Sequence, residues 1–111
     1  MKLSFADARV QDLCSSRDAL VIEYGAALAR KICCRLALLM AAPTLACVPE
    51  ALPVGLMRVA GQGRFAVAVG GTHSLEFYTL PKETSDMLDP SQVSMLLIIG
   101  VVANPSAKAL H

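Results

Sequence analysis

The chain has 111 residues and a formal net charge of +1, so it can bury one core but carries no strong basic or acidic field. Any contact with nucleic acid would therefore depend on a local patch of cations. Apolar residues make up 55% of the chain and charged residues only 17%. This balance predicts that part of the apolar surface needs a partner to cover it.

The start of the chain has charges where a secretory signal would be apolar, and no apolar run is long enough to cross a bilayer. We therefore expect a cytosolic protein without a membrane partner. A single domain is expected over residues 1–111, with a loose tail at residues 104–111.

Helices are expected in the first half of the chain. Residues 2–5 predict a short strand, and residues 5–14 a short helix, after which Ser15 or Ser16 can cap a second helix. This second helix is the longest and ends near Ala42, and Gly25 marks either a kink or its true start. Its apolar stripe consists of Leu28, Ile32, Leu36, Leu39 and Met40, with Arg30 and Cys34 towards the opposite side.

Strict alternation over residues 64–78, broken by Gly70-Gly71, predicts a β-hairpin. A two-residue loop would put the large apolar residues of the two arms on opposite faces. A three-residue loop over residues 70–72 puts them all on one face, and it is the one we predict, with a glycine at the position of positive φ. The other face then carries Arg64, Ala66, Ala68, Ser74, Glu76 and Tyr78, which form either a binding floor or a solvated outer face.

Two further strands flank this hairpin. Residues 56–60 predict a strand that leads into the turn Gly61-Gln62-Gly63, and residues 79–91 a long polar loop. Residues 93–102 alternate poorly and are apolar throughout, which predicts a central strand covered on both faces. The expected fold is α+β, with two N-terminal helices packed on one mainly antiparallel sheet of four to five strands, in meander order.

Few residues carry an obvious chemical signature. Cys14, Cys33, Cys34 and Cys47 lack the spacing of a metal site and are expected to be small buried hydrophobes, so no metal or other cofactor is predicted. His73 is a lone histidine on the apolar face, where a core or edge role is commoner than catalysis. Arg58 and Arg64 flank the Gly61-Gln62-Gly63 turn and could either clamp a phosphate or remain solvated.

Several phrases, in order, resemble the HigB-type plasmid-maintenance killer proteins of the RelE/ParE toxin superfamily. The resemblance covers about residues 2–103. It is carried by Leu3-Ser4-Phe5, Asp12-Leu13-Cys14, Leu38-Leu39-Met40-Ala41-Ala42-Pro43-Thr44-Leu45-Ala46, Arg58-Val59-Ala60-Gly61, Phe65-Ala66-Val67-Ala68-Val69, Gly70-Gly71, Leu75-Glu76-Phe77 and Asp89-Pro90-Ser91-Gln92-Val93.

The resemblance implies a small RelE/ParE-like toxin of a type II toxin-antitoxin system, held inactive by a cognate antitoxin. Many members are metal-independent endoribonucleases that cut messenger RNA on the ribosome, whereas the ParE branch inhibits DNA gyrase. In the cleavage reaction a 2′-hydroxyl attacks the adjacent phosphate, helped by arginine, lysine, tyrosine or histidine side chains.

The chain departs from the family where that chemistry would lie. Ser74 stands where the family usually has an arginine, Ala68 where it often has an acidic residue, and Ala103-Asn104-Pro105 where it ends in Asp-Tyr-His. The remaining candidates are Arg58, Arg64 and Tyr78 for catalysis, and Arg58, Arg64 and Lys82 for RNA binding. Two functions stay open: a ribonuclease toxin, either active or with weakened catalysis, and a binding-only member that pairs with an antitoxin or blocks a target such as DNA gyrase.

Overall fold

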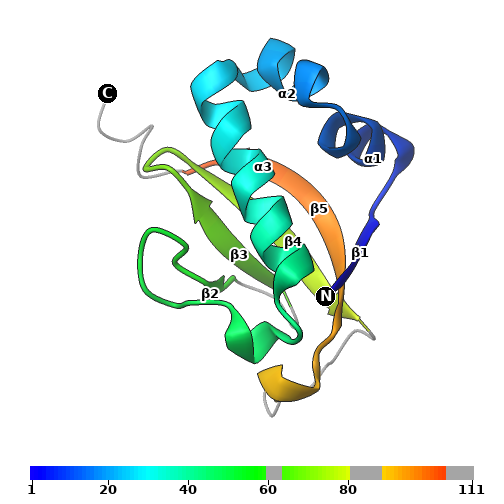
Figure 1. Cartoon of the computed structure of the whole chain (residues 1–111), viewed down its shortest axis with the longest axis vertical. Coiled ribbons are helices and arrows are strands. Elements are labelled where there is room, and N and C mark those ends of the chain that lie inside the picture. The colour runs from blue at the N-terminus through cyan, green and yellow to red at the C-terminus, as the bar shows by residue number, and fades with distance from the viewer. Residues whose placement is uncertain (60–63, 81–88, 105–111) are drawn as a thin grey trace.

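The chain folds as an α+β unit in which the helices lie on one side of a five-stranded mixed sheet (Figure 1). The computed structural model describes residues 1–59, 64–80 and 89–104. In that part of the chain the elements are β1 Lys2–Phe5, α1 Ala8–Ser15, α2 Arg17–Tyr24, α3 Ala26–Ala41, β2 Met57–Arg58, β3 Arg64–Val69, β4 His73–Leu80 and β5 Met95–Ala103, with short 3₁₀ turns at Leu45–Cys47 and Pro90–Gln92.

The sheet has the order β1-β5-β4-β3-β2, and its four consecutive strands β2 to β5 pair antiparallel, as the predicted meander requires. The predicted strand at residues 2–5 joins the outer side of β5 in parallel. The sheet is therefore mainly antiparallel, as expected. The general α+β class is also confirmed.

The hairpin has the predicted three-residue loop. Val69 pairs with His73 and Phe65 with Phe77, which places the large apolar side chains that flank the loop on one face. The rings of Phe65 and Phe77 stack with their centroids 6.3 Å apart. Gly70 adopts a φ of 66°, a conformation that costs most other residues free energy because their Cβ would approach the following carbonyl.

In the part of the chain that the structure describes, three helices replace the two that the sequence predicts, because the long helix is divided at Gly25. This residue has a φ of 86° and separates α2 from α3, so it marks the true start of the long helix. Asp7 and Ser16 each accept a hydrogen bond from the backbone three residues on, which caps α1 and α2. The first helix consequently begins at Ala8 rather than at residue 5.

The core lies between α3 and the apolar face of the hairpin and β5. The stripe on α3 is confirmed for Ile32, Leu36 and Leu39, which are all buried, but is wrong for Met40, which is 63% exposed. Adjacent residues point in different directions from a helix, and on α3 it is Leu39 that points into the core while Met40 points away from it. The buried core residues of the sheet are Phe65, Val67, Val69, Leu75, Phe77, Leu96 and Ile98.

The prediction that β5 is covered on both faces is wrong. This strand lies inside the sheet, between β1 and β4, but Met95 and Val102 are 39% and 37% exposed. Its poor alternation has another cause, because the pairing with β4 shifts between Glu76 and Phe77 and leaves Ile99 as an extra residue. After this β-bulge, Val101 faces the core although it lies an odd number of residues from Ile98.

Two polar contacts tie α3 to the strands around it. The guanidinium of Arg35 donates to the carbonyls of Ala68 and Pro53, at 2.7 and 3.0 Å, and the Ala68 N–H donates to the carbonyl of Val54. These bonds satisfy the outer edge of β3 beyond the short strand β2. The ammonium of Met1 donates to the carbonyls of Leu39, Met40 and Ala42, where a cation complements the carboxyl end of the helix.

The structure corrects the start of the predicted loop at residues 79–91 and the start of the predicted tail at residues 104–111. β4 continues to Leu80, so the predicted loop over residues 79–91 begins later, and residues 81–88 lie outside the described residues, as does the turn Gly61-Gln62-Gly63. Asn104, expected to be loose, accepts from the Ser74 hydroxyl at 2.7 Å and donates to the Thr72 carbonyl. The rest of the predicted tail, residues 105–111, is not described.

The prediction that the cysteines are buried is wrong for two of the four. Cys34 and Cys47 are exposed, because Cys34 lies on the outer side of α3 and Cys47 in the 3₁₀ turn after that helix. Cys14 and Cys33 are half-buried, and all four are free thiols. Burial raises the pKa of the Cys14 thiol above its ordinary value, and the nearby Cys33 acts in the same direction.

Replacing Phe77 by alanine should cost about 3–5 kcal/mol of unfolding free energy, because its fully buried ring would leave a cavity at the centre of the sheet. Urea denaturation of the two proteins measures this loss. Ile22→Ala is the matched control, since Ile22 is 86% exposed and its truncation should leave the midpoint nearly unchanged. Equal midpoints for wild type and Phe77→Ala would contradict this account of the core.

Gly70→Ala should destabilise the hairpin by about 1–2 kcal/mol, because an L-residue at positive φ is strained. A Cβ at this position would also lie 3.3 Å from Nζ of Lys31. Gly71→Ala is the matched control, since a Cβ there meets no atom within 4 Å and its φ is not in the positive region. Thermal unfolding of both variants is the measurement, and an equal loss in the two would show that the φ of Gly70 is not the cause.

Candidate functional site

The face of the sheet that points away from the helices carries the polar residues predicted to form a binding floor. In the strand register, Arg64 lies opposite Tyr78, Ala66 opposite Glu76, and Ala68 opposite Ser74. On β5 the same face continues with Leu97 beside Tyr78 and Val102 beside Ser74. We call the residues Arg64, Ala66, Ala68, Ser74, Glu76 and Tyr78 the open-face cluster.

An ion pair dominates the open-face cluster. The guanidinium of Arg64 donates to Oε1 of Glu76 from both Nε, at 3.0 Å, and a terminal nitrogen. The two residues occupy diagonal positions on neighbouring strands, where long side chains of opposite charge can meet. The Glu76 side chain is only 12% exposed, so its carboxylate depends on this partner to offset lost hydration.

The ion pair also favours the charged form of Arg64. Its hydrogen bond with Glu76 raises the pKa of the guanidinium further above its already high value, and a hydrogen bond with Tyr78 adds to this. The anion nearest to Arg64 therefore belongs to the protein itself. The Arg64 side chain as a whole remains 33% exposed.

Arg58 is not part of this cluster. It pairs with Phe65 in the register and its guanidinium carbon lies 5.1 Å from the centre of the Phe65 ring, on the helical side of the sheet. This is a cation–π contact at an exposed edge, worth about 0.5–1 kcal/mol. Arg58 and Arg64 thus lie on opposite faces of the sheet, and the structure does not bring them together as a phosphate clamp.

The remaining sequence-predicted residues are dispersed. Lys82 lies outside the described residues. His73 is half-exposed at the end of β4, on the helical side, where its ring meets Tyr24 edge-to-face at 5.9 Å and its Nδ1 lies 2.8 Å from the Thr72 hydroxyl. These contacts fit the edge role predicted for this histidine. Burial of Tyr24 raises the pKa of its phenol.

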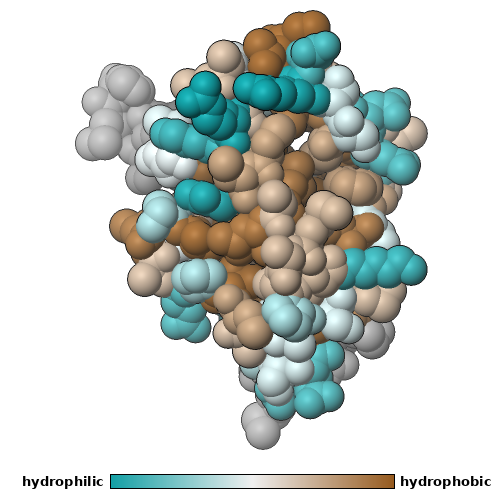
Figure 2. All heavy atoms as spheres, in the orientation of Figure 1, coloured by the Kyte–Doolittle hydropathy of each residue, from teal (hydrophilic) through white to brown (hydrophobic). Residues whose placement is uncertain are grey.

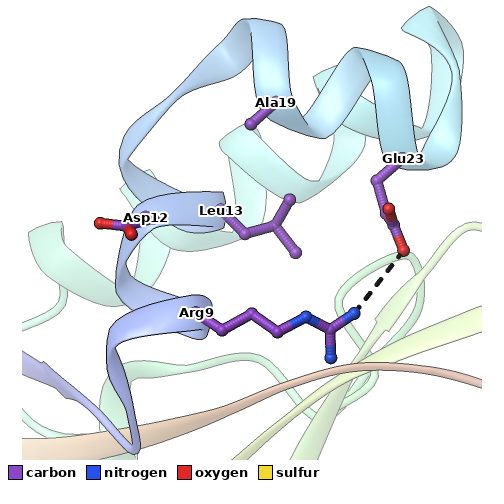
Figure 3. A pocket seen from close by; sticks show the side chains of 5 residues that line it. All are labelled: Arg9, Asp12, Leu13, Ala19 and Glu23. Atoms are coloured by element: carbon purple, nitrogen blue, oxygen red, sulfur yellow. Dashed lines mark ion pairs between the residues drawn. The ribbon is translucent and has the colours of Figure 1, made fainter.

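A hollow of about 500 Å³ between α1 and α2 was not predicted from the sequence (Figure 3). Its walls carry Arg9, Asp12, Leu13, Ala19 and Glu23. Arg9 reaches towards Glu23 across the opening, with 4.0 Å between the charged atoms, and both side chains are well exposed. Such a pair contributes little to stability, and Asp12 adds a second carboxylate that would repel an anionic ligand.

Over residues 1–59, 64–80 and 89–104, no three histidine, cysteine, aspartate or glutamate side chains are grouped so that they could hold a metal ion. None of the helices in those ranges is long and apolar enough to cross a membrane.

Comparison with models of protein families, with curated proteins and with solved structures finds no match. The functional assignment of the chain therefore depends on its own residues and their geometry.

The Arg64–Glu76 pair should show strong coupling in a double-mutant cycle. Arg64→Ala leaves the Glu76 carboxylate largely buried without its partner, which should cost about 1–3 kcal/mol, between the values for exposed and fully buried pairs. Adding Glu76→Gln should recover part of this loss, because a neutral amide is less costly to bury. Urea denaturation of the wild type, both single variants and the double variant measures the coupling. Strictly additive losses would contradict the pairing.

Proposed function

We propose that this chain is a RelE/ParE-like toxin of a type II toxin-antitoxin system that acts by binding its target and has weak or no ribonuclease activity. The order of its elements supports the first part of the proposal. Helices precede an antiparallel meander, and the phrases that resemble HigB-type proteins extend from β1 to Val93, just before β5.

The observation that carries the second part is the arrangement of the cations. Arg64 is paired with Glu76, and Arg58 lies on the other face of the sheet, over Phe65. Cleavage of RNA requires preorganised groups that stabilise charge on one phosphate, and loss of one such group typically costs about 2.7–4 kcal/mol. Ser74, which stands where the family usually has an arginine, uses its hydroxyl to donate to Asn104.

Exposed apolar surface supports the need for an antitoxin. In Figure 2 the helical side is mostly brown and tan over its centre, and hydrophilic residues gather at the top and the margins. The most exposed large apolar residues of the described chain include Ile22, Leu52, Met40 and Met57, at 86, 80, 63 and 51%. A cognate antitoxin that covers such surface would stabilise the toxin and hold it inactive.

An active ribonuclease is the second candidate, and one observation favours it. Arg64 and Tyr78 lie directly opposite each other on neighbouring strands, and the Arg64 side chain is 33% exposed. These two residues could hold a phosphate and stack or orient the adjoining nucleotide. In this case Glu76 would compete with the phosphate for Arg64.

Inducible expression, scored for growth arrest, together with mapping of ribosome-bound message in EDTA, tests the proposal. We expect growth arrest without cleavage above background, and relief of the arrest when a cognate antitoxin is co-expressed. Absence of growth arrest would overturn the assignment as a toxin.

Variants of the open-face cluster separate the two candidates. If the chain cuts RNA through Arg64, then Arg64→Ala should slow cleavage about 10²–10³-fold, as for other charge-stabilising groups. Arg58→Ala serves as the matched arginine on the opposite face and should have little effect. Metal-independent cleavage that is slowed by Arg64→Ala but not by Arg58→Ala would show that the chain acts by cutting RNA and not only by binding its target. If Arg64→Ala alone does not fold, the double variant Arg64→Ala/Glu76→Ala takes its place, because it also removes the carboxylate that would be left without a partner.

A further inference from the structure

We propose that the hollow between α3 and the β3–β4 turn is a binding site for a phosphate group. This basic pocket has a volume of about 370 Å³ and is formed by two cations, a glycine turn and an apolar wall. The residues that line it are Lys31, Arg35, Leu52, Pro53, Gly70 and Gly71. It lies at the turn end of the hairpin and does not include any residue of the open-face cluster.

Arg35 is held in place before any ligand arrives. Its Nε and one terminal nitrogen donate to the carbonyls of Ala68 and Pro53, and these two bonds fix the plane of the guanidinium. A guanidinium has five N–H donors, so three remain for a ligand. Because the side chain is already ordered, binding to it costs less conformational entropy than binding to a solvated arginine.

Lys31 completes the site from the preceding turn of α3. Residues four apart lie on the same side of a helix, so its ammonium and the guanidinium of Arg35 face the same hollow. The ammonium reaches the hairpin turn, since a Cβ built on Gly70 would lie 3.3 Å from Nζ of Lys31. The missing side chain of Gly70 therefore leaves space at the cation.

The charge of the basic pocket is not neutralised by the described protein. Among the residues that the structure describes, none that lines the basic pocket has a carboxylate. The ion pairs between described residues involve neither Lys31 nor Arg35. Two cations that face one hollow repel each other, and an anion between them removes this repulsion. Arg64 differs in this respect, because the carboxylate of Glu76 offsets its charge.

Both cations suit a phosphate group as the anion. The fork of a guanidinium matches two phosphate oxygens, and an ammonium binds phosphate as a point charge. Leu52 and Pro53 add an apolar wall, and Leu52 is 80% exposed, so it could lie against the sugar or base of a nucleotide. The shared chemistry is a phosphate group, supplied either by a free nucleotide or by a nucleic-acid backbone.

The test is a titration of the ¹⁵N-labelled full-length chain with inorganic phosphate at constant ionic strength, followed by amide chemical shifts. We expect saturable shifts at residues 31–35 and 70–71. Lys31→Gln should weaken binding about tenfold, the effect of losing one charge-assisted hydrogen bond. Arg30→Gln is the matched control, because Arg30 neighbours Lys31 on α3, is exposed and does not line the pocket.

The proposal is overturned if the shifts do not saturate, or if Arg30→Gln weakens binding as much as Lys31→Gln. Arg35→Lys, which keeps the charge but loses the planar fork, should also weaken binding if the variant folds; Lys31→Gln decides the result if it does not. Parallel titrations with a nucleoside monophosphate and with a short single-stranded RNA identify the source. Tighter binding of the RNA, lost in Lys31→Gln, assigns the phosphate to a nucleic-acid backbone, and equal affinities assign it to a free nucleotide.

Discussion

The three-residue turn of the hairpin is the constraint on which the rest of the structure depends. Because Val69 pairs with His73, and not with Thr72 as a two-residue loop would require, the large apolar residues that flank the turn all lie on the helical face. A change of one residue in the register would move the set contributed by one strand to the open face. Glycine adopts the positive φ that this turn requires, so Gly70 favours the register that puts the apolar residues of both strands on one face.

The hairpin, the meander and the helical stripe could be predicted because each depends on a local period. The sequence leaves open whether Gly25 kinks the helix or begins a new one. A glycine inside a helical pattern can lie within the helix or can end it, and tertiary packing decides between the two. The two-sided burial of β5 was predicted wrongly because a β-bulge and a buried strand both remove alternation from the sequence. A positive φ at Gly100, next to Ile99, distinguishes the bulge, and only the backbone reveals it.

In the candidate site, too, the features that depend on a local period could be predicted, and those that depend on contacts between distant segments could not. That Arg64, Glu76 and Tyr78 share a face follows from parity and could be predicted. A clamp of Arg58 with Arg64 is one of the two alternatives that their closeness in the chain allows, but cross-strand pairing with Phe65 puts Arg58 on the helical side. The basic pocket joins α3 to a turn much later in the chain, and no short-range pattern connects those segments.

Arg64 on the open face and Arg35 in the basic pocket differ in whether a carboxylate offsets their charge. Arg64 has a largely buried carboxylate as its partner, so an anionic ligand must displace Glu76 and bear the cost of leaving that carboxylate unpaired. Arg35 is bound by neutral carbonyls, which orient its guanidinium without cancelling its charge. An arginine held in this way keeps its attraction for anions while losing its mobility. Of these two arginines, the one that is held in place without a carboxylate partner is therefore Arg35, beside the hairpin turn and not on the open face of the sheet.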